Sequence, residues 1–119
     1  MLILRTLLLV PANQERRIGK ARSVPADALI LDLEDSVPLS EKDAARQMMA
    51  ASVDELATGG QEVFVRTNSL PTPYAIPDIK VVVTRGLRGI CLPKSESADD
   101  IHKVDVLITD AEKEAGLML

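Results

Sequence analysis

The sequence predicts an α/β fold with parallel strands, and three observations support this prediction. Four short apolar runs recur along the 119 residues, and most of them show no alternation of apolar and polar residues. Such runs are typical of strands that are buried on both faces, as in a parallel sheet. Helical patterns lie between the runs, which begin roughly 25 to 35 residues apart, as expected for strand–helix units with right-handed crossovers.

The apolar runs define the expected strands. They are Ile3–Val10, Ala28–Leu33, Val63–Val65 and Gly89–Leu92. The stretch that contains the first strand is too short for a membrane span, which takes about 20 residues as a helix. Arg5 interrupts this stretch, and the residues after it turn polar without a small-residue cleavage site. We therefore predict a buried strand there rather than a signal peptide.

Capping residues and spacing predict the first two helices. Asn13 is a candidate cap for a helix over Gln14–Arg22. Ser40 and Asp43 form an S-x-x-D start for the second helix, and the Gly-Gly pair at residues 59–60 ends it. The side of this helix expected to face the core consists of Ala44, Met48, Ser52 and Leu56.

The third helix is expected over Asp78–Arg85, after a rigid Pro-rich loop at Leu70–Pro77. In the last helix Ser97 and Asp100 suggest a capping box, and Gly116 is the expected C-terminal cap. The residues expected on its buried side are Ile101, Val104, Ile108, Ala111 and Ala115.

The end of the sequence, Leu117–Leu119, looks like the opening of a fifth strand. Two architectures accept four strand–helix units: an open doubly wound sheet or part of a (β/α)₈ barrel. No glycine lies in Val10–Glu15, after the first strand, so a dinucleotide-binding sheet is excluded. A whole barrel takes about 250 residues. We therefore expect residues 1–119 to form one domain, either another kind of open sheet or a partial barrel that stops before a fifth strand is complete.

Composition narrows the function classes. The formal net charge is −4, only 2% of the residues are aromatic, and Cys91 is the single cysteine. A nucleic-acid-binding protein would need a basic face, often with aromatic side chains for stacking. One cysteine allows neither an internal disulfide nor a multi-cysteine zinc site. We expect a cytoplasmic protein with no nucleic-acid or membrane partner.

Polar residues follow every predicted strand, at the edge where parallel α/β folds bind ligands. Asp32 lies inside the second strand, where a lone carboxylate is costly to bury. It is either hydrogen-bonded to a neighbouring loop or functional. Glu34 and Asp35 follow it; they suit a hard cation such as Mg²⁺, a nearby lysine, or merely a solvated turn.

Two cations follow the third and fourth strands. Arg66 is suited to bidentate binding of a substrate carboxylate, or to an ion pair with Glu34 or Asp35. Lys94 could neutralise an enolate or organise the same two carboxylates. Three further features are expected to be structural: His102 on a helix surface, Cys91 in the core, and the solvated basic cluster Arg16, Arg17, Lys20 and Arg22.

Four ordered motifs resemble the HpcH/HpaI aldolase and citrate lyase superfamily, particularly the citrate lyase beta chains. They are R-T-L-L-L-V-P at residues 5–11, A-D-A-L-I-L-D-L-E-D-S-V at 26–37, V-R-T-N at 65–68 with T-P-Y at 72–74, and G-I-C-L-P-K-S-E-S at 89–97. They span nearly the whole chain in the family's order and spacing, so the set is specific although each motif alone is weak.

The resemblance implies the first half of a (β/α)₈ barrel from a Mg²⁺-dependent carbon–carbon lyase. Its substrates would be citryl- or malyl-type acyl groups on CoA or an acyl carrier protein, and a homo-oligomer is expected. In that scheme Arg66 binds the keto-acid carboxylate, with Asn68 as a second substrate-binding residue. Glu34, Asp35 and Lys94 form the catalytic set, in which the two carboxylates order metal-bound water and the basic groups around it.

The sequence departs from the family pattern mildly at Ala12, where glycine is common, and at residues 69–71. The family's direct metal ligands, a Glu ending the fifth strand and an Asp after the sixth, are expected beyond Leu119, so no metal ligand is predicted within the chain. An alternative is therefore a noncatalytic half-barrel that self-associates through its exposed strand edges.

Overall fold

The computed structural model describes residues 1–117. Four strands form one sheet in chain order, and every neighbouring pair is parallel. They are β1 (Leu7–Pro11), β2 (Ala28–Asp32), β3 (Val63–Arg66) and β4 (Leu87–Cys91). Each overlaps one of the predicted strands, so the predicted α/β class with parallel strands is confirmed.

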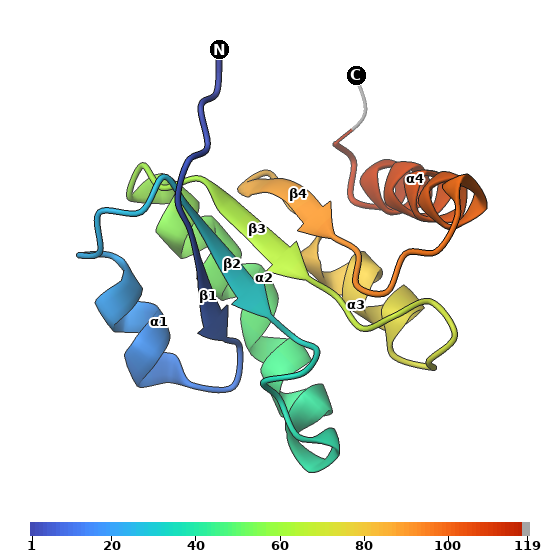
Figure 1. The fold of residues 1–119 in the computed structure, drawn as a ribbon, viewed down its shortest axis with the longest axis horizontal. Coiled ribbons are helices and arrows are strands. Elements are labelled where there is room, and N and C mark those ends of the chain that lie inside the picture. Colours follow the sequence, from blue (N-terminus) through green and yellow to red (C-terminus); the bar gives the residue numbers. More distant parts are fainter. Residues whose placement is uncertain (118–119) are drawn as a thin grey trace.

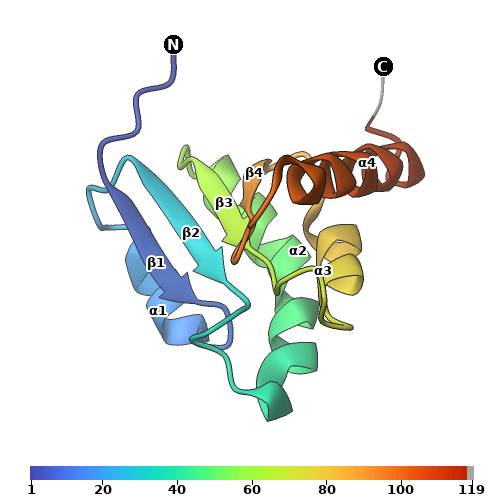
Figure 2. The same ribbon diagram turned by 45° about the vertical axis from the view of Figure 1, so that its right-hand side comes forward.

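A helix follows each strand. The helices are α1 (Glu15–Ala21), α2 (Lys42–Thr58), α3 (Ala75–Val82) and α4 (Ala98–Glu114), and a short 3₁₀ turn, η1 (Leu39–Glu41), precedes α2. Figures 1 and 2 show α1, α2 and α3 on the same side of the sheet, with α4 beside α3. Within residues 1–117 no helix is long and apolar enough to cross a membrane.

The main core lies between the sheet and the helices on its covered side. Alternate strand residues face this side, because successive side chains of a strand point to opposite faces. Leu29, Leu31, Val63 and Val65 are fully buried there. They belong to one hydrophobic cluster with residues of α2, namely Ala45, Met49, Val53 and Leu56. The buried members of this cluster are Val, Leu, Ile, Ala and Met, which fits a sequence with only 2% aromatic residues.

The first strand begins four residues later than predicted. Before β1, the backbone N–H groups of Arg5 and Thr6 donate to the Asp27 carboxylate at 2.7 and 3.1 Å, and Thr6 Oγ1 accepts from the Asp27 N–H at 3.0 Å. This side-chain anchor holds the segment before the strand, and sheet pairing starts only at Leu7.

Two predicted caps are wrong. Gln14 precedes α1 with no side-chain cap, and Asn13 Nδ2 instead donates to Glu41 Oε1 at 3.0 Å. Ser40 lies in the η1 turn, so α2 begins only at Lys42. The buried side of α2 is also displaced by one residue through most of its length, because Val53 rather than the hydroxyl-bearing Ser52 faces the core. The Gly-Gly pair does end this helix.

Helix α3 begins inside the segment predicted as a loop. Pro77 lies in its first turn, where backbone N–H groups make no hydrogen bond within the helix. A proline there loses no such bond, and its fixed φ suits a helix. The helix ends at Val82, ahead of the predicted Arg85.

The predicted Ser97 and Gly116 caps of α4 are confirmed, but the Asp100 carboxylate accepts from the Glu96 N–H at 3.0 Å rather than from the Ser97 N–H that a capping box uses. Ser97 Oγ accepts from the Asp100 N–H at 3.4 Å, and Gly116 adopts a φ of 72° while the Leu117 N–H donates to Glu112 O. Val104 and Ala111 are buried as predicted, whereas Ile101 and Ala115 are exposed, and Ala115 lies just beyond the end of the helix. Of the predicted fifth strand, Leu117 belongs to this helix cap, and residues 118–119 lie outside the described part of the chain.

Candidate functional site

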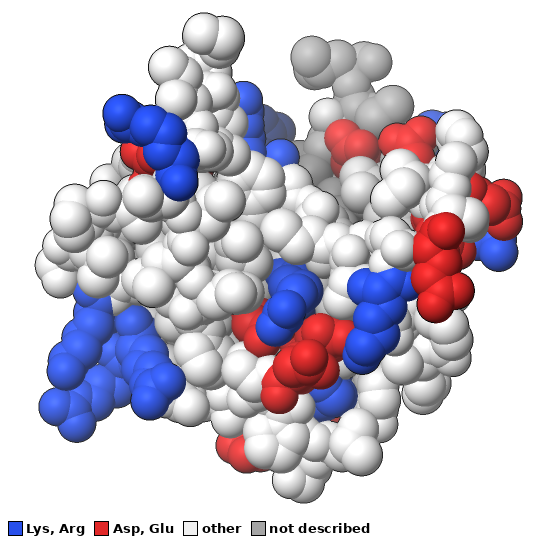
Figure 3. All heavy atoms as spheres, viewed as in Figure 1, with Lys and Arg blue, Asp and Glu red and all other residues white. Residues whose placement is uncertain are grey.

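The carboxyl ends of β2, β3 and β4 bring acidic and basic side chains together. Five of these residues form one connected set of ion pairs, which we call the rim cluster: Asp32, Glu34, Asp35, Arg66 and Lys94. Figure 3 shows blue and red side chains meeting near the centre of the face onto which Figure 1 looks. A cavity of about 170 Å³ lies beside the cluster, lined in part by Glu34, Asp35 and Lys94.

Asp32 and Arg66 form the best-defined pair of the rim cluster. Arg66 Nε donates to Asp32 Oδ1 at 2.8 Å, and Arg66 Nη2 donates to Asp32 Oδ2 at 2.7 Å. The two residues are register partners at the ends of β2 and β3, so parallel pairing itself places them side by side. One alternative for Arg66 was an ion pair with Glu34 or Asp35. Its nearest carboxylate is that of Asp32, and Glu34 forms a longer ion pair at 3.7 Å.

Asp32 also organises the loop after its own strand. Its carboxylate accepts from the Glu34 N–H at 2.9 Å, the Ser36 N–H at 3.1 Å and the Ser36 hydroxyl at 2.6 Å. Burial acts to raise the pKa of Asp32, but the hydrogen bonds from Arg66, Ser36 and the backbone outweigh it and lower the pKa to about 2. Asp32 therefore stays ionised and holds both Arg66 and the Glu34 loop in place.

Glu34 and Lys94 form the second pair. Lys94 Nζ donates to Glu34 Oε2 at 2.8 Å and lies 4.0 Å from Asp35 Oδ1. The Glu34 hydrogen bond raises the pKa of Lys94, so the amine is protonated at neutral pH. Lys94 has a φ of 54°, an uncommon value for a residue with a side chain. Glu34 is buried whereas Asp35 is exposed, so the two adjacent carboxylates have different environments.

Asn68 is held from behind by a buried carboxylate. The Asn68 N–H and Nδ2 both donate to Asp78 Oδ2, at 2.9 and 2.7 Å, and Asp78 Oδ1 accepts from Arg46 Nε at 2.9 Å. Because Nδ2 donates to Asp78, the Asn68 side chain is oriented by α3. Asn68 also lines the cavity beside the rim cluster. The sequence analysis identified neither Asp78 nor Arg46 as part of this arrangement.

Lys42 is a further residue that the sequence analysis missed. Its side chain is buried, its Nζ donates to the backbone oxygens of Leu33 and Glu34 at 3.0 Å each, and it lies 5.7 Å from the centre of the Tyr74 ring. It thereby fixes the backbone that carries Glu34. The sequence places Lys42 nine residues after Leu33, close enough along the chain to reach the loop that follows β2. A lysine at such a position is usually solvated, so its burial could not be predicted.

Replacing Lys42 with methionine is expected to lower the free energy of unfolding by about 2 kcal/mol while preserving much of the packing. The substitution removes the Lys42 donor from Leu33 O and leaves Glu34 O with the Val37 N–H, at 3.1 Å, as its remaining donor. Urea unfolding followed by circular dichroism measures the change. Lys80, an exposed lysine on α3, supplies the control Lys80→Met, which is expected to change stability by less than about 0.5 kcal/mol. Equal effects of the two substitutions would show that the buried hydrogen bonds of Lys42 contribute nothing.

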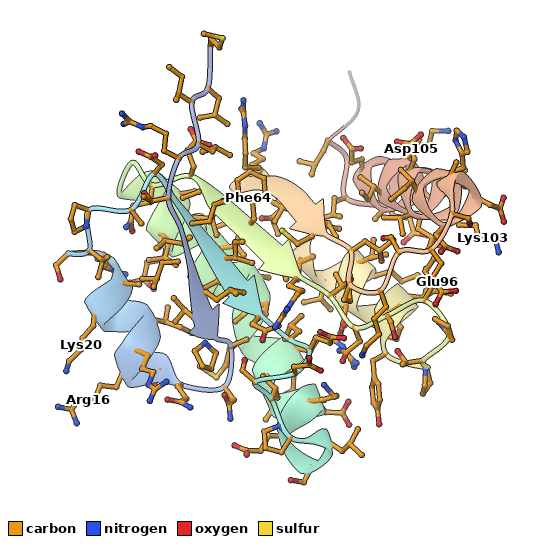
Figure 4. The ribbon with its side chains drawn as sticks, viewed as in Figure 1. Arg16, Lys20, Phe64, Glu96, Lys103 and Asp105 are labelled. Atoms are coloured by element: carbon orange, nitrogen blue, oxygen red, sulfur yellow. The ribbon has the colours of Figure 1, made fainter. Side chains whose placement is uncertain are left out.

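The remaining predicted residues lie away from the rim cluster, with one exception. His102 is exposed on α4, and the basic cluster is exposed on α1, where Figure 4 labels Arg16 and Lys20. Cys91, expected in the core, is only half-buried and is the register partner of Arg66. Burial raises the pKa of its thiol, so Cys91 is not an activated nucleophile.

Comparison with known proteins shows the family to which this chain belongs. Residues 5–118 match the family described as HpcH/HpaI aldolase/citrate lyase. The chain belongs to this family. Among its relatives is the citrate lyase subunit beta of Leuconostoc mesenteroides subsp. cremoris, 43% identical over 112 residues, which covers 94% of this chain and 37% of the relative. A (3S)-malyl-CoA thioesterase of Cereibacter sphaeroides is 33% identical over 106 residues, covering 89% of this chain and 37% of the relative.

Solved structures support the fold. A citrate lyase beta subunit from M. tuberculosis, complexed with oxaloacetate and magnesium, is 30% identical with a TM-score of 0.65 and is matched over 82% of this chain and 42% of that one. A Haloferax volcanii malate synthase in a magnesium/glyoxylate complex has a TM-score of 0.85 at 18% identity, covering 99% of this chain and 40% of that one, and so shows the fold alone. The chain spans about two fifths of the length of these proteins.

The described residues do not form a direct magnesium site. Asp32 and Glu34 already face Arg66 and Lys94 at hydrogen-bond distance, so their charges are compensated by cations. Within residues 1–117 no group of three or more His, Cys, Asp or Glu side chains is placed to hold a metal ion.

Proposed function

We propose that this chain carries the substrate-carboxylate site of a carbon–carbon lyase that acts on 3-hydroxyacyl thioesters of the citryl or malyl type. The observation that supports the proposal is the Asp32–Arg66 pair. A guanidinium has five N–H donors, of which two go to Asp32, so three remain for a second carboxylate. Family membership and relatives named citrate lyase subunit beta support the reaction class.

In this proposal the two cations of the rim cluster have different roles. Arg66, held rigidly by Asp32, binds the carboxylate of the substrate. Lys94, held by Glu34, lies where it can stabilise the negative charge that develops on an oxygen as the carbon–carbon bond breaks. The Asn68 carbonyl oxygen accepts a hydrogen bond from the substrate, because its amide nitrogen already donates to Asp78. Asp35 contributes a second negative charge near Lys94.

The proposed reaction is a retro-aldol cleavage. The bond between C2 and C3 of the thioester breaks, the hydroxyl on C3 loses its proton and becomes a carbonyl, and the bonding electron pair passes to the thioester carbonyl as an enolate, which is then protonated. CoA or an acyl carrier protein bears the acyl group. Magnesium dependence of the whole protein is part of this proposal, with ligands outside the described residues and no step assigned to the ion here.

The domain assignment is also proposed: residues 1–119 form one partial (β/α)₈ domain of four strand–helix units. The cytoplasmic location, the homo-oligomer and the absence of nucleic-acid or membrane partners stay predictions. Thioester hydrolysis is a second candidate function, because relatives named (3S)-malyl-CoA thioesterase are 32–34% identical to this chain.

The experiment assays the whole protein that contains these residues with citryl-CoA and malyl-CoA, with and without Mg²⁺. Cleavage yields acetyl-CoA and an oxo acid, whereas hydrolysis yields free CoA and a hydroxy acid, so a thiol reagent distinguishes the two. Arg66→Lys is expected to lower kcat/KM at least about 100-fold, because an ammonium cannot reproduce bidentate binding.

Arg5→Lys is the matched control. Arg5 also contacts an aspartate, Asp27, but on the exposed segment that precedes β1, and its replacement is expected to leave kcat/KM within about twofold. Lack of both activities in the whole protein would refute the proposal. Hydrolysis of the thioester without carbon–carbon cleavage would instead support the second candidate function, thioester hydrolysis.

A further inference from the structure

A buried hydrogen-bond network lies behind the cavity beside the rim cluster. Asp78 of α3 is 1% exposed and accepts three hydrogen bonds, from Arg46 Nε of α2 and from the backbone N–H and Nδ2 of Asn68. Helix α2 packs against both β3 and α3. The network is therefore enclosed by consecutive elements of the chain, and neither outer strand of the sheet contributes to it.

The network fixes which end of the Asn68 amide faces the cavity. Asn68 Nδ2 donates to Asp78 Oδ2 at 2.7 Å. Exchange of the two ends of the amide would place Asn68 Oδ1 against this carboxylate oxygen, and neither oxygen has a proton to donate. Asp78 Oδ1 is itself held by Arg46 Nε at 2.9 Å, so the carboxylate is fixed at both oxygens. The amide is therefore held in one orientation.

The carbonyl end of this amide is free to bind a ligand. Among the described residues no group donates to Asn68 Oδ1, yet this oxygen is not one of the fully enclosed polar atoms that lack a partner. It is therefore within reach of the cavity of about 170 Å³ that Asn68 lines together with Glu34, Lys42 and Lys94. Both lysines there already donate to groups of the chain. Asn68 Oδ1 thus offers the cavity a neutral acceptor in a fixed position.

An acceptor of this kind distinguishes between the groups of the proposed substrate. The acyl part of a malyl or citryl thioester has carboxylates, a thioester carbonyl and one hydroxyl, and at neutral pH only the hydroxyl has a proton to donate. The other groups accept hydrogen bonds, for which the cations Arg66 and Lys94 are the donors at the site. After cleavage the hydroxyl has become the carbonyl of an oxo acid, which cannot donate to Asn68 Oδ1.

We propose that Asn68 Oδ1 recognises the 3-hydroxyl group of the substrate, and that Asp78, held by Arg46, is a positioning residue that keeps this oxygen towards the cavity. This recognition rests on the proposed function, because it takes a 3-hydroxyacyl thioester as the ligand. It gives the site a specificity: a thioester with the hydroxyl binds in preference to the same thioester without it. The analogue without the hydroxyl leaves the acceptor unpaired, which is costly in a closed site.

Calorimetric titration of the whole protein with malyl-CoA and with succinyl-CoA tests the proposal. Succinyl-CoA differs from malyl-CoA only in lacking the hydroxyl, and both are titrated with EDTA present, so that the proposed Mg²⁺-dependent cleavage does not occur. The Kd for malyl-CoA is expected to lie at least about tenfold below that for succinyl-CoA. In Asp78→Asn this ratio is expected to fall to about one, because the Asn68 amide is no longer held. The Kd for succinyl-CoA should stay within about threefold, which a general distortion of the site would not allow.

Two further variants separate recognition of the hydroxyl from positioning. Asn68→Ala removes the acceptor itself and is expected to abolish the preference for malyl-CoA, and it tests the recognition even if circular dichroism shows that Asp78→Asn is unfolded. Combining the two substitutions should cause no further loss, because Asp78 acts through Asn68. Asp43→Asn is the matched control: it removes an exposed carboxylate that also contacts Arg46, and it should leave the ratio within about twofold.

Equal affinities for the two thioesters in the unmodified protein would show that the hydroxyl is not recognised, while binding through Arg66 would still stand. A preference that survives Asn68→Ala would place the hydroxyl at another residue. A preference that survives in folded Asp78→Asn, or that Asp43→Asn abolishes equally, would remove the positioning role of Asp78. Binding of neither thioester would refute the proposed function itself, and recognition of the hydroxyl with it.

Discussion

Replacing Asp32 with asparagine is expected to lower the free energy of unfolding by about 3 kcal/mol at neutral pH. The substitution removes the charge that compensates Arg66 and weakens the acceptor for Ser36 and the Glu34 N–H. Loss of one partner from a buried ion pair costs about 3–5 kcal/mol, and we expect the lower end because Arg66 keeps some contact with water. Urea unfolding of the two proteins measures the difference.

The effect of Asp32 should depend on pH. The pKa of this carboxyl is lowered from 3.8 to about 2 in the folded chain, so its ionised form stabilises the fold. That contribution is fully present above about pH 4 and is lost as pH falls from 4 towards 2, because protons then bind the unfolded chain first. The stability difference between the two proteins should shrink by about 2 kcal/mol over this range.

Asp35→Asn is the control for this prediction. Asp35 belongs to the same loop and the same ion-pair cluster, but it is exposed and lies 4.0 Å from its nearest cation. Its replacement is expected to change stability by less than about 0.5 kcal/mol. If Asp35→Asn destabilised the chain as much as Asp32→Asn, overall charge rather than the buried pair would account for both effects.

Replacing Asp78 with asparagine is expected to cost a similar amount, about 3 kcal/mol. Asp78 is 1% exposed, and its two oxygens accept three hydrogen bonds, from Arg46 Nε and from two groups of Asn68. In asparagine one of these two oxygens is replaced by an amide N–H₂, which cannot accept a hydrogen bond. Either Arg46 Nε or the two Asn68 groups therefore lose their buried acceptor. Arg46 Nη2 is already buried with no hydrogen-bond partner in the described structure. The guanidinium therefore has no spare acceptor nearby to replace the one that Asp78 provides.

A neighbouring residue provides the control. Arg46 also contacts Asp43, through Nη1 at 3.2 Å, but the Asp43 side chain is 83% exposed. Asp43→Asn likewise removes a carboxylate that contacts Arg46, and it is expected to lower the free energy of unfolding by less than about 0.5 kcal/mol. Exchange of the Asn68 side-chain amide protons, followed by NMR, gives an independent measurement: it should accelerate in Asp78→Asn only. Unchanged protection in that variant would contradict the assigned hydrogen bond.

Strand positions were the most predictable part of the fold. The four apolar runs locate β1 to β4 without any knowledge of their partners, although only β2 is almost entirely buried among the described residues. Helix boundaries were less predictable because caps compete with tertiary contacts. Asn13 has the right chemistry for a cap but contacts Glu41, which lies 28 residues away in sequence. Pro77 resembles a loop residue and is compatible with a helix only because it lies in the first turn.

The membership of the rim cluster was predicted, and so was the contact of Lys94 with Glu34 or Asp35, but the pairing of Arg66 with Asp32 was not. Glu34, Asp35, Arg66 and Lys94 follow the ends of their strands, and parallel strands bring those ends to one edge. The pairing of Arg66 with Asp32 depends on the register of β2 against β3. The supporting residues Lys42, Arg46 and Asp78 lie on helices, where a charged side chain gives no signal of burial in the sequence.

The sequence by itself therefore determined the fold class, the family and the residues at the carboxyl edge of the sheet. Each of these depends on the order and spacing of residues along the chain, which local physical chemistry can interpret. Only the tertiary structure decided which acid neutralises which base, which polar side chains are buried behind them, and which face of the sheet packs against α1, α2 and α3. These features depend on strand register and helix packing, which bring together residues as far apart as Glu34 and Lys94.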